Sequence, residues 1–314
     1  MEWETRVTKL LGCKYPILEG AFQDEGSWQL AAAVAEAGAH GTITASASRT
    51  PEGLREDIKR CRDATDGSFG VNISLGGCPQ LEKTLEVCIE EGVVLETSGY
   101  KPDTLVPRIK EARLKWIHKA TIVKDALHAE RLGADAVILS ALEGYVFKRP
   151  SILPLLTTIT WGVRQINVPI VAAGGIGDAH GFLAALGMGA DGIMMGTAFL
   201  ATKESPMSDR DKKATVQLSP DHPQHRLRIL STPDHERYEK VMKMRDQLPL
   251  QEWLLMLERV TLEDPAWEEA LSKLPRVSLA VAVINHVPTV KELIDSVTHG
   301  AEEILDSWQF LKTR

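Results

Sequence analysis

One repeating pattern dominates the first two thirds of the chain: a short apolar run, a turn and an amphipathic segment with helical spacing. The apolar runs are continuous rather than alternating, which is typical of parallel strands buried on both faces. We expect strands at residues 15–22, 41–45, 69–75, 93–98, 115–120, 136–142, 169–174 and 192–196. The intervening segments predict helices at 27–38, 51–64, 81–91, 103–112, 123–132, 155–166 and 179–187.

Eight strands in strict alternation with helices predict a closed (β/α)8 barrel, which typically needs about 200 residues or more. An open doubly wound sheet also alternates, but it usually has fewer strands and a switch point. After residue 202 the strand pattern stops, and we expect helices at 235–248, 250–260, 265–271 and 279–312. The prediction is therefore an α/β TIM barrel over residues 1–205, with a C-terminal helical extension over 206–314 packed on it as a cap.

Composition and charge indicate which classes of binding partner are unfavourable. A net charge of -7 without basic clusters argues against nucleic acid and anionic membranes. No stretch approaches the roughly 20 apolar residues of a membrane span, and the N-terminus does not resemble a signal peptide. The four cysteines lack CxxC spacing and read as buried, reduced thiols, and no ligand spacing indicates a metal site. We expect a cytoplasmic protein, and the apolar stripe of the last predicted helix suggests a homodimer.

Two glycine-containing turns follow the seventh and eighth predicted strands. Residues 172–178 read AAGGIGD and residues 192–197 read GIMMGT. Glycines at a strand-to-helix turn let backbone N–H groups approach an anion, and the next helix N-terminus favours negative charge. Because TIM barrels often bind phosphate in these two loops, the pair predicts a phosphate site. The alternative is turn glycines without a ligand.

At these turns the sequence resembles the nitronate monooxygenase (2-nitropropane dioxygenase) family of FMN-dependent TIM barrels. The resemblance extends to its relatives, the NADH:quinone reductases and the flavin-type enoyl-acyl-carrier-protein reductases. It runs from about residue 6 to 205 and more loosely through 278–305. The segments that carry it are 16–20 (PILEG), 69–73 (FGVNI), 117–120 (IHKA), 133–137 (GADAV), 172–176 (AAGGI), 189–192 (GADG), 196–197 (GT) and 204–205 (ES).

The resemblance implies an FMN site. The flavin ring would lie along the backbone of Gly20, Ala21 and Phe22, with Asn72 as a hydrogen-bond partner and Lys119 near the ring or ribityl chain. The phosphate would be held by the two turns, at Ala173, Gly174, Gly175, Met195, Gly196 and Thr197. A positive charge near the flavin raises its reduction potential, which favours Lys119 as a catalytic group. Its strand neighbour His118 should point to the helix layer instead.

The chain departs from the family after the sixth strand. The family has a Glu-Ala-Gly-Gly-His type of turn whose His is the catalytic base, whereas Phe147 occupies that place here. Phenylalanine cannot accept a proton. Phe22, Tyr145 and Phe147 would shape the substrate pocket, either as packing or as altered substrate choice, with Tyr145 as a possible catalytic proton donor. The first strand also departs, because Glu19 stands where the family usually has Gln.

Several other charged residues are open to two interpretations. Lys148 and Arg149 form either a solvated pair on a loop or a receiver for a carboxylate or coenzyme A phosphates. His180 faces either the phosphate or water. The histidines of the helical region show no ligand spacing and are expected at the surface: His222, His225 and His235.

Three functions stay open. The first is an FMN-dependent oxidoreductase of the nitronate monooxygenase family that lacks the usual His. The second is an NAD(P)H-dependent flavin reductase acting on a quinone or an enoyl thioester. The third is a flavin-binding protein with weakened catalysis. A barrel that binds a phosphorylated metabolite without flavin, with Lys119 as a Schiff-base lysine, is a further alternative.

Overall fold

The computed structural model describes residues 1–78, 80–99, 102–262 and 274–308. Eight parallel strands follow one another around a barrel in the order β1-β8-β7-β6-β5-β4-β3-β2. Between β1 and β2 the ring closes through His40, whose N–H donates to the Ile17 carbonyl at 2.9 Å and whose carbonyl accepts from Glu19 N–H at 2.8 Å. The predicted barrel is confirmed. The strands are β1 (Ile17–Glu19), β2 (Gly41–Thr44), β3 (Phe69–Ser74), β4 (Val94–Ser98), β5 (Trp116–Ala120), β6 (Ala136–Ser140), β7 (Ile170–Ala173) and β8 (Gly192–Met195).

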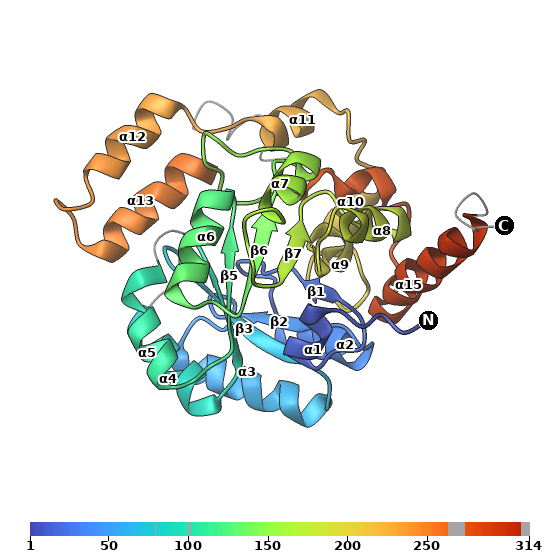
Figure 1. Cartoon of the computed structure of the whole chain (residues 1–314), viewed down its shortest axis with the longest axis horizontal. Helices are drawn as coiled ribbons and strands as arrows, with labels where there is room; N and C mark the ends of the chain where they lie inside the picture. The colour runs from blue at the N-terminus through green and yellow to red at the C-terminus, as the bar shows by residue number, and fades with distance from the viewer. Residues whose placement is uncertain (79, 100–101, 263–273, 309–314) are drawn as a thin grey trace.

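Helices cover the outside of the barrel, as Figure 1 shows. The residues that begin and end them explain their bounds: Ser27, Thr50 and Asp178 accept backbone N–H groups at N-termini, and Gly92 and Gly133 end helices in the left-handed conformation. They are α2 (Trp28–Glu36), α3 (Pro51–Ala64), α4 (Leu81–Glu91), η1 (Pro102–Thr104), α5 (Val106–Glu111), α6 (Val123–Leu132), α7 (Leu155–Gly162) and α8 (Ala179–Gly187).

Strand residues alternate between two cores. One set points into the barrel and packs with Val7 and Leu11 of a short helix, α1 (Arg6–Leu11), which the sequence pattern did not predict. This inward set includes Leu18, Ile117, Ile138 and Val171. The other set packs against the helices and includes Ile17, Val71, Leu139 and Ile193. Alternation thus decides which polar strand residues can reach the barrel interior.

The extension is helical in its described part. The barrel range ends with α9 (Thr197–Leu200). The extension contains α10 (Asp209–Gln217), α11 (Pro223–Leu230), α12 (His235–Lys243), α13 (Leu250–Leu262), η2 (Leu279–Val283) and α15 (Val290–Ser307). The predicted helices at 235–248 and 250–260 are confirmed, whereas α9, α10 and α11 were missed. The helix predicted at 265–271 lies outside the described residues. The one predicted at 279–312 is two elements, because Pro288 disfavours helical backbone before it, and residues 309–312 lie outside the described part.

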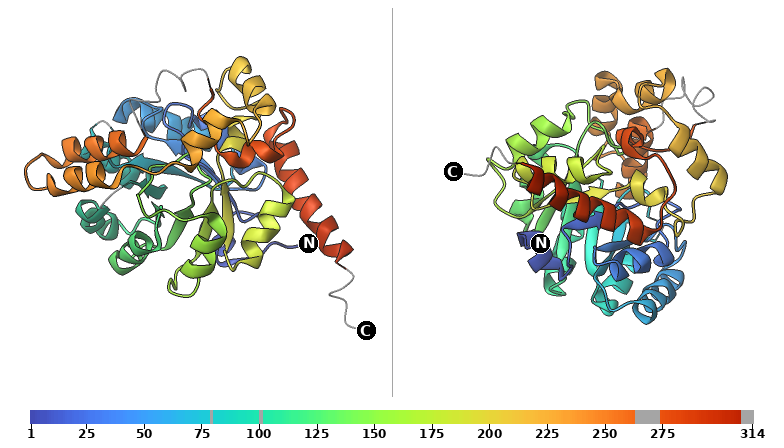
Figure 2. Two further views of the ribbon diagram at one scale, coloured as in Figure 1. Left: turned by 90° about the horizontal axis from the view of Figure 1, so that it is seen from above. Right: turned by 90° about the vertical axis from the view of Figure 1, so that its right-hand side faces the viewer.

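The middle and the last helix of the extension lie on different sides of the barrel. Figure 2 shows α12 and α13 as a hairpin on one side and α15 on the other. The apolar stripe of α15 packs on α8 and α2 of the same chain, so the observation that suggested a dimer is explained within one chain. The approach to α8 is close, since a Cβ at Gly300 would lie 3.0 Å from the Ala179 Cβ. Among the described residues, no helix combines the length and apolar character of a membrane span.

Candidate functional site

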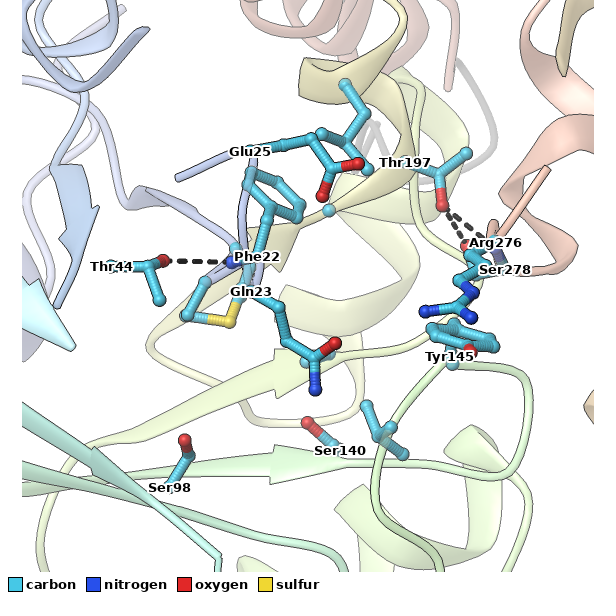
Figure 3. A pocket seen from close by; sticks show the side chains of 18 of the residues that line it. Phe22, Gln23, Glu25, Thr44, Ser98, Ser140, Tyr145, Thr197, Arg276 and Ser278 are labelled. Atoms are coloured by element: carbon cyan, nitrogen blue, oxygen red, sulfur yellow. Dashed lines mark hydrogen bonds between the residues drawn. The ribbon is translucent and has the colours of Figure 1, made fainter. Parts of the chain in front are cut away.

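A pocket of about 630 Å³ opens at the C-terminal ends of the strands, where TIM-barrel active sites lie (Figure 3). Its volume falls within the roughly 300–1,000 Å³ typical of ligand sites. Twelve of the predicted site residues line it: Gly20, Ala21, Phe22, Asn72, Lys119, Tyr145, Phe147, Ala173, Gly174, Gly175, Gly196 and Thr197. Met195 does not, because its side chain packs in the outer core, and its neighbour Met194 lines the pocket instead.

The two glycine turns form one wall of this pocket. Gly174 and Gly175 have φ of +116° and +74°, a region that L side chains rarely adopt. At the N-terminus of α8 the Asp178 carboxylate accepts from Gly181 N–H at 2.8 Å. The helix N-terminus that was expected to favour an anion therefore already has one carboxylate of the chain at its first turn.

The backbone that leads from β1 into the pocket is held at both sides. Gly20 lies against β8, where a Cβ would come within 2.9 Å of the Gly196 Cα. Phe22 N–H donates to Thr44 Oγ1 of β2 at 3.0 Å. The segment expected along the flavin ring is thus fixed by two strands, and only glycine fits at position 20.

The pocket floor is polar and organised by a buried carboxyl group. Asn72 Nδ2 donates to Glu96 Oε1 at 2.8 Å, and Ser98 Oγ lies 3.3 Å from the same nitrogen. Burial raises the pKa of Glu96, while the positive charge of Lys119 and the Asn72 hydrogen bond oppose that rise. Glu96 therefore orients the Asn72 amide and provides the acidic neighbour of Lys119.

Ser140 ends β6 at the same floor. Its side chain is fully buried and lines the pocket, yet its hydroxyl has no hydrogen-bond partner among the described residues. An unpaired buried hydroxyl costs free energy unless a ligand or water satisfies it. The floor is thus built to receive a polar ligand.

Aromatic side chains and one guanidinium shape the opening. Phe22, Tyr145 and Phe147 are half-buried and line the pocket. In Figure 3 the Arg276 guanidinium lies beside the Tyr145 ring, next to Ser278. Ser278 is bonded to the turn after β8, because its N–H donates to Thr197 Oγ1 at 2.9 Å. The segment that carries Arg276 thus forms part of the site.

Glu19 closes the barrel wall beside the pocket. Its Oε2 accepts from Thr42 N–H at 2.9 Å, one step beyond the His40 bridge between β1 and β2. The side chain is fully buried, and its Oε1 has no partner among the described residues. Burial raises the pKa of this carboxyl well above its ordinary value, and the Thr42 hydrogen bond only partly opposes that. The buried surroundings of Glu19 therefore favour the protonated form of this carboxyl group.

Other predicted positions fall outside the pocket. His118 points to the helix layer as expected: its Nδ1 lies 2.8 Å from Thr97 Oγ1, and burial lowers its pKa to about 4. His180 is 80% exposed and does not line the pocket. The expectation of surface histidines was wrong for His225, which is buried on α11, because the sequence did not reveal which face of this helix packs inside the extension.

Lys148 and Arg149 are neither a solvated pair nor part of the pocket lining. Lys148 is buried and donates to the carbonyls of Ile229 and Ser231 at the end of α11. Arg149 pairs with Asp125 at 2.6 Å and donates to the Tyr238 hydroxyl at 2.6 Å. The two cations fasten the loop after β6 to α6, α11 and α12.

Sequence reasoning missed several lining residues. Thr44, Ser98 and Ser140 are the last residues of their strands, and a polar residue ending an apolar strand is the signal that would have found them. Glu25 and Arg276 gave no such signal, because only the fold brings the loop after β1 and the extension to the same opening.

The chain is similar in sequence to a protein family and to curated proteins of known name. The sequence model described as nitronate monooxygenase matches residues 4–225. A probable nitronate monooxygenase of Staphylococcus saprophyticus is 31% identical over 262 residues, covering 69% of this chain and 74% of that protein. The (3aS,4S,5R,7aS)-5-hydroxy-7a-methyl-1-oxo-octahydro-1H-indene-4-carboxyl-CoA dehydrogenase of Mycobacterium tuberculosis is 34% identical over 223 residues, covering 70% of this chain and 62% of that protein.

Solved structures agree with the barrel assignment. FabK from Thermotoga maritima superposes with a TM-score of 0.78 at 30% identity, covering 98% of this chain and 99% of that chain. A nitroalkane oxidase from Streptomyces ansochromogenes has a TM-score of 0.72 at 22% identity, covering 96% of this chain and all of that chain, which shows a shared fold.

Proposed function

Because the chain belongs to the nitronate monooxygenase family of oxidoreductases, we propose that it binds FMN in the barrel pocket and uses it to oxidise or reduce a small molecule. The observation that carries this proposal is the combination of the glycine turns after β7 and β8 with a polar floor in one pocket. FMN has the matching parts, a phosphate at one end and a hydrogen-bonding ring at the other.

The residues present fit FMN. The turn backbone at Gly174, Gly175 and Gly196 would hold the phosphate, and the unpaired Ser140 hydroxyl is available to a polar part of the ligand. Asn72 would bond the ring, and Lys119 would supply positive charge near it. When bound, the flavin supplies the electron-transfer chemistry, whereas the chain supplies orientation and charge.

Phe147 favours one of the two leading reactions over the other. Nitronate oxidation that relies on a base at this position would be impaired, because a phenyl ring cannot take a proton. Hydride transfer from NAD(P)H makes no such demand, so the second candidate is a reductase acting on a quinone or enoyl thioester. Tyr145 is the hydroxyl that we propose as proton donor on this side of the pocket. A third possibility is a flavin-binding protein with weakened catalysis. Observed turnover with any electron donor would exclude it.

An anaerobic absorbance titration with NADH and then NADPH tests the proposal. A flavin spectrum that bleaches with either nucleotide supports the reductase candidate. A flavin spectrum that does not bleach until an alkyl nitronate is added supports nitronate oxidation. Protein without any flavin absorbance, and unable to bind added FMN, contradicts the proposed function.

A further inference from the structure

The opening of the pocket contains an arginine without an acidic partner. Arg276 is exposed, lines the pocket and forms no ion pair with any residue in the described ranges. Its guanidinium lies beside the Tyr145 ring in Figure 3. A guanidinium presents a planar fork of donors that matches a carboxylate, and a phenol hydroxyl adds another donor. The pair therefore offers donors on one side of the opening.

Arg276 is held in place by the extension. Arg228 of α11 donates to the carbonyls of Leu274 and Pro275 at 3.3 and 3.0 Å, which fixes the segment immediately before Arg276. On the other side, Ser278 is bonded to Thr197. The backbone is thus anchored on both sides of Arg276, which limits the positions that its guanidinium can reach.

The charges around the opening restrict where an anion can lie. Asp24, Glu25 and Asp211 line the same opening and would repel an anion. Burial raises the pKa of Glu25, and the positive charge of Arg276 partly opposes that rise. Glu25 and Arg276 do not form an ion pair. Arg228 adds a second guanidinium near Tyr145. Arg210 also lines the opening, next to Asp211 in the chain, and Lys119 lies on the floor. The corner between Arg276 and Tyr145 is therefore favourable for negative charge at the opening.

We propose that Arg276, together with the Tyr145 hydroxyl, forms a subsite that binds a carboxylate of the substrate, while Phe22 and Phe147 contact its apolar body. The inference rests on the proposed function, because the carboxylate would belong to the molecule that reacts with the flavin. The same donors could instead bind the flavin phosphate, since Ser278 joins Arg276 to the phosphate turn. In both cases Arg276 binds an oxyanion. The experiment distinguishes a substrate carboxylate from the flavin phosphate.

The test uses benzoate and benzamide, which have the same shape but differ in charge. Their binding to the purified protein is measured by isothermal titration calorimetry, with the flavin content determined in parallel. We expect benzoate to bind at least about tenfold more tightly than benzamide, and R276Q to abolish this preference. Y145F, which keeps the ring, should reduce the preference by less. R226Q removes the same charge from α11 outside the pocket and should leave the preference intact.

Three outcomes overturn the inference. Equal binding of benzoate and benzamide to the unaltered protein shows that the corner does not select an anion. A preference that survives in R276Q places the anion elsewhere. Loss of FMN affinity in R276Q, with the benzoate preference retained, assigns Arg276 to the flavin phosphate. Failure of the proposed function gives a different result, namely no flavin binding in any variant, and the calorimetric comparison can still be made.

Discussion

Lys119 brings the positive charge of the pocket floor, with Glu96 as its acidic neighbour. If FMN lies above it, the charge should stabilise the reduced cofactor. We predict that K119M lowers the flavin reduction potential by about 30 mV or more, equivalent to ~1.4 kcal/mol for a two-electron couple. Spectroelectrochemical titration measures the shift. K124M, at an exposed position at the start of α6, is the control, and equal potentials in all three proteins would remove Lys119 from the flavin site.

Glu19 makes the stability depend on pH in a predictable direction. Burial raises its folded-state pKa well above the ordinary 4.5, so above that pH the unfolded chain loses a proton that the folded protein keeps. Stability is then lost as pH rises, by up to about 1.4 kcal/mol per pH unit until the folded pKa is reached.

The variant E19Q keeps the acceptor for Thr42 N–H and removes the titration. We predict that the free energy of unfolding of E19Q, relative to that of the unaltered protein, rises by at least about 1 kcal/mol from pH 5 to pH 7.5. Urea denaturation at the two pH values measures the gain. The same difference in unfolding free energy at both values would show that Glu19 is ionised in the folded state.

Single residues were predictable from sequence where strand alternation decides their direction. That rule places Lys119 in the pocket and His118 in the helix layer. It gave no information on Arg276 or the buried His225, because both lie in the extension, whose packing depends on contacts between distant segments. Lys148 was misjudged for the same reason, since its partners at Ile229 and Ser231 belong to α11.

At the scale of elements, the turn after β7 requires glycine at Gly174 and Gly175, because both residues have positive φ. We predict that G174A destabilises the protein by about 1–3 kcal/mol, because alanine is strained at φ +116°. Its Cβ would also press on the Ala141 carbonyl at 3.2 Å. Chemical denaturation measures the cost, and FMN affinity should fall in parallel.

The matched control is G187A at the end of α8, where a Cβ would meet no atom within 4 Å. There alanine should be neutral or stabilise by about 0.5–1 kcal/mol. Equal effects of the two substitutions would show that the conformation of the β7 turn is not required.

The elements of the barrel could be read from the sequence because short, largely apolar runs alternate with helical segments and are separated by turns. The short helices α1, α10 and α11 could not. α1 has only six residues, and its place beneath the barrel follows from packing of Val7 and Leu11 on inward strand residues. Periodicity needs several turns of helix to be visible, so short helices depend on tertiary contacts.

On the scale of the whole molecule, α15 joins the chain's end to the barrel. Its fully buried Ile294 lies in the stripe that faces α8 and α2. We predict that I294A lowers the free energy of unfolding by about 2–5 kcal/mol. Because we propose that residues 206–314 pack on the barrel rather than fold alone, circular dichroism and tryptophan fluorescence should report one shared transition.

E303A, at an exposed position of α15, should leave this transition unchanged. Two separate transitions, of which I294A moves only one, would divide the chain into independent units and contradict the proposed organisation.

The central claim is that the barrel pocket binds FMN through its phosphate as well as its ring. The most direct test compares the affinity of the flavin-free protein for FMN and for riboflavin, which lacks the phosphate. Quenching of flavin fluorescence measures both affinities. We predict that FMN binds at least about a hundredfold more tightly, since a phosphate accepts several charge-assisted hydrogen bonds from the turns. Equal affinity for the two flavins, or no binding of either, would contradict the account.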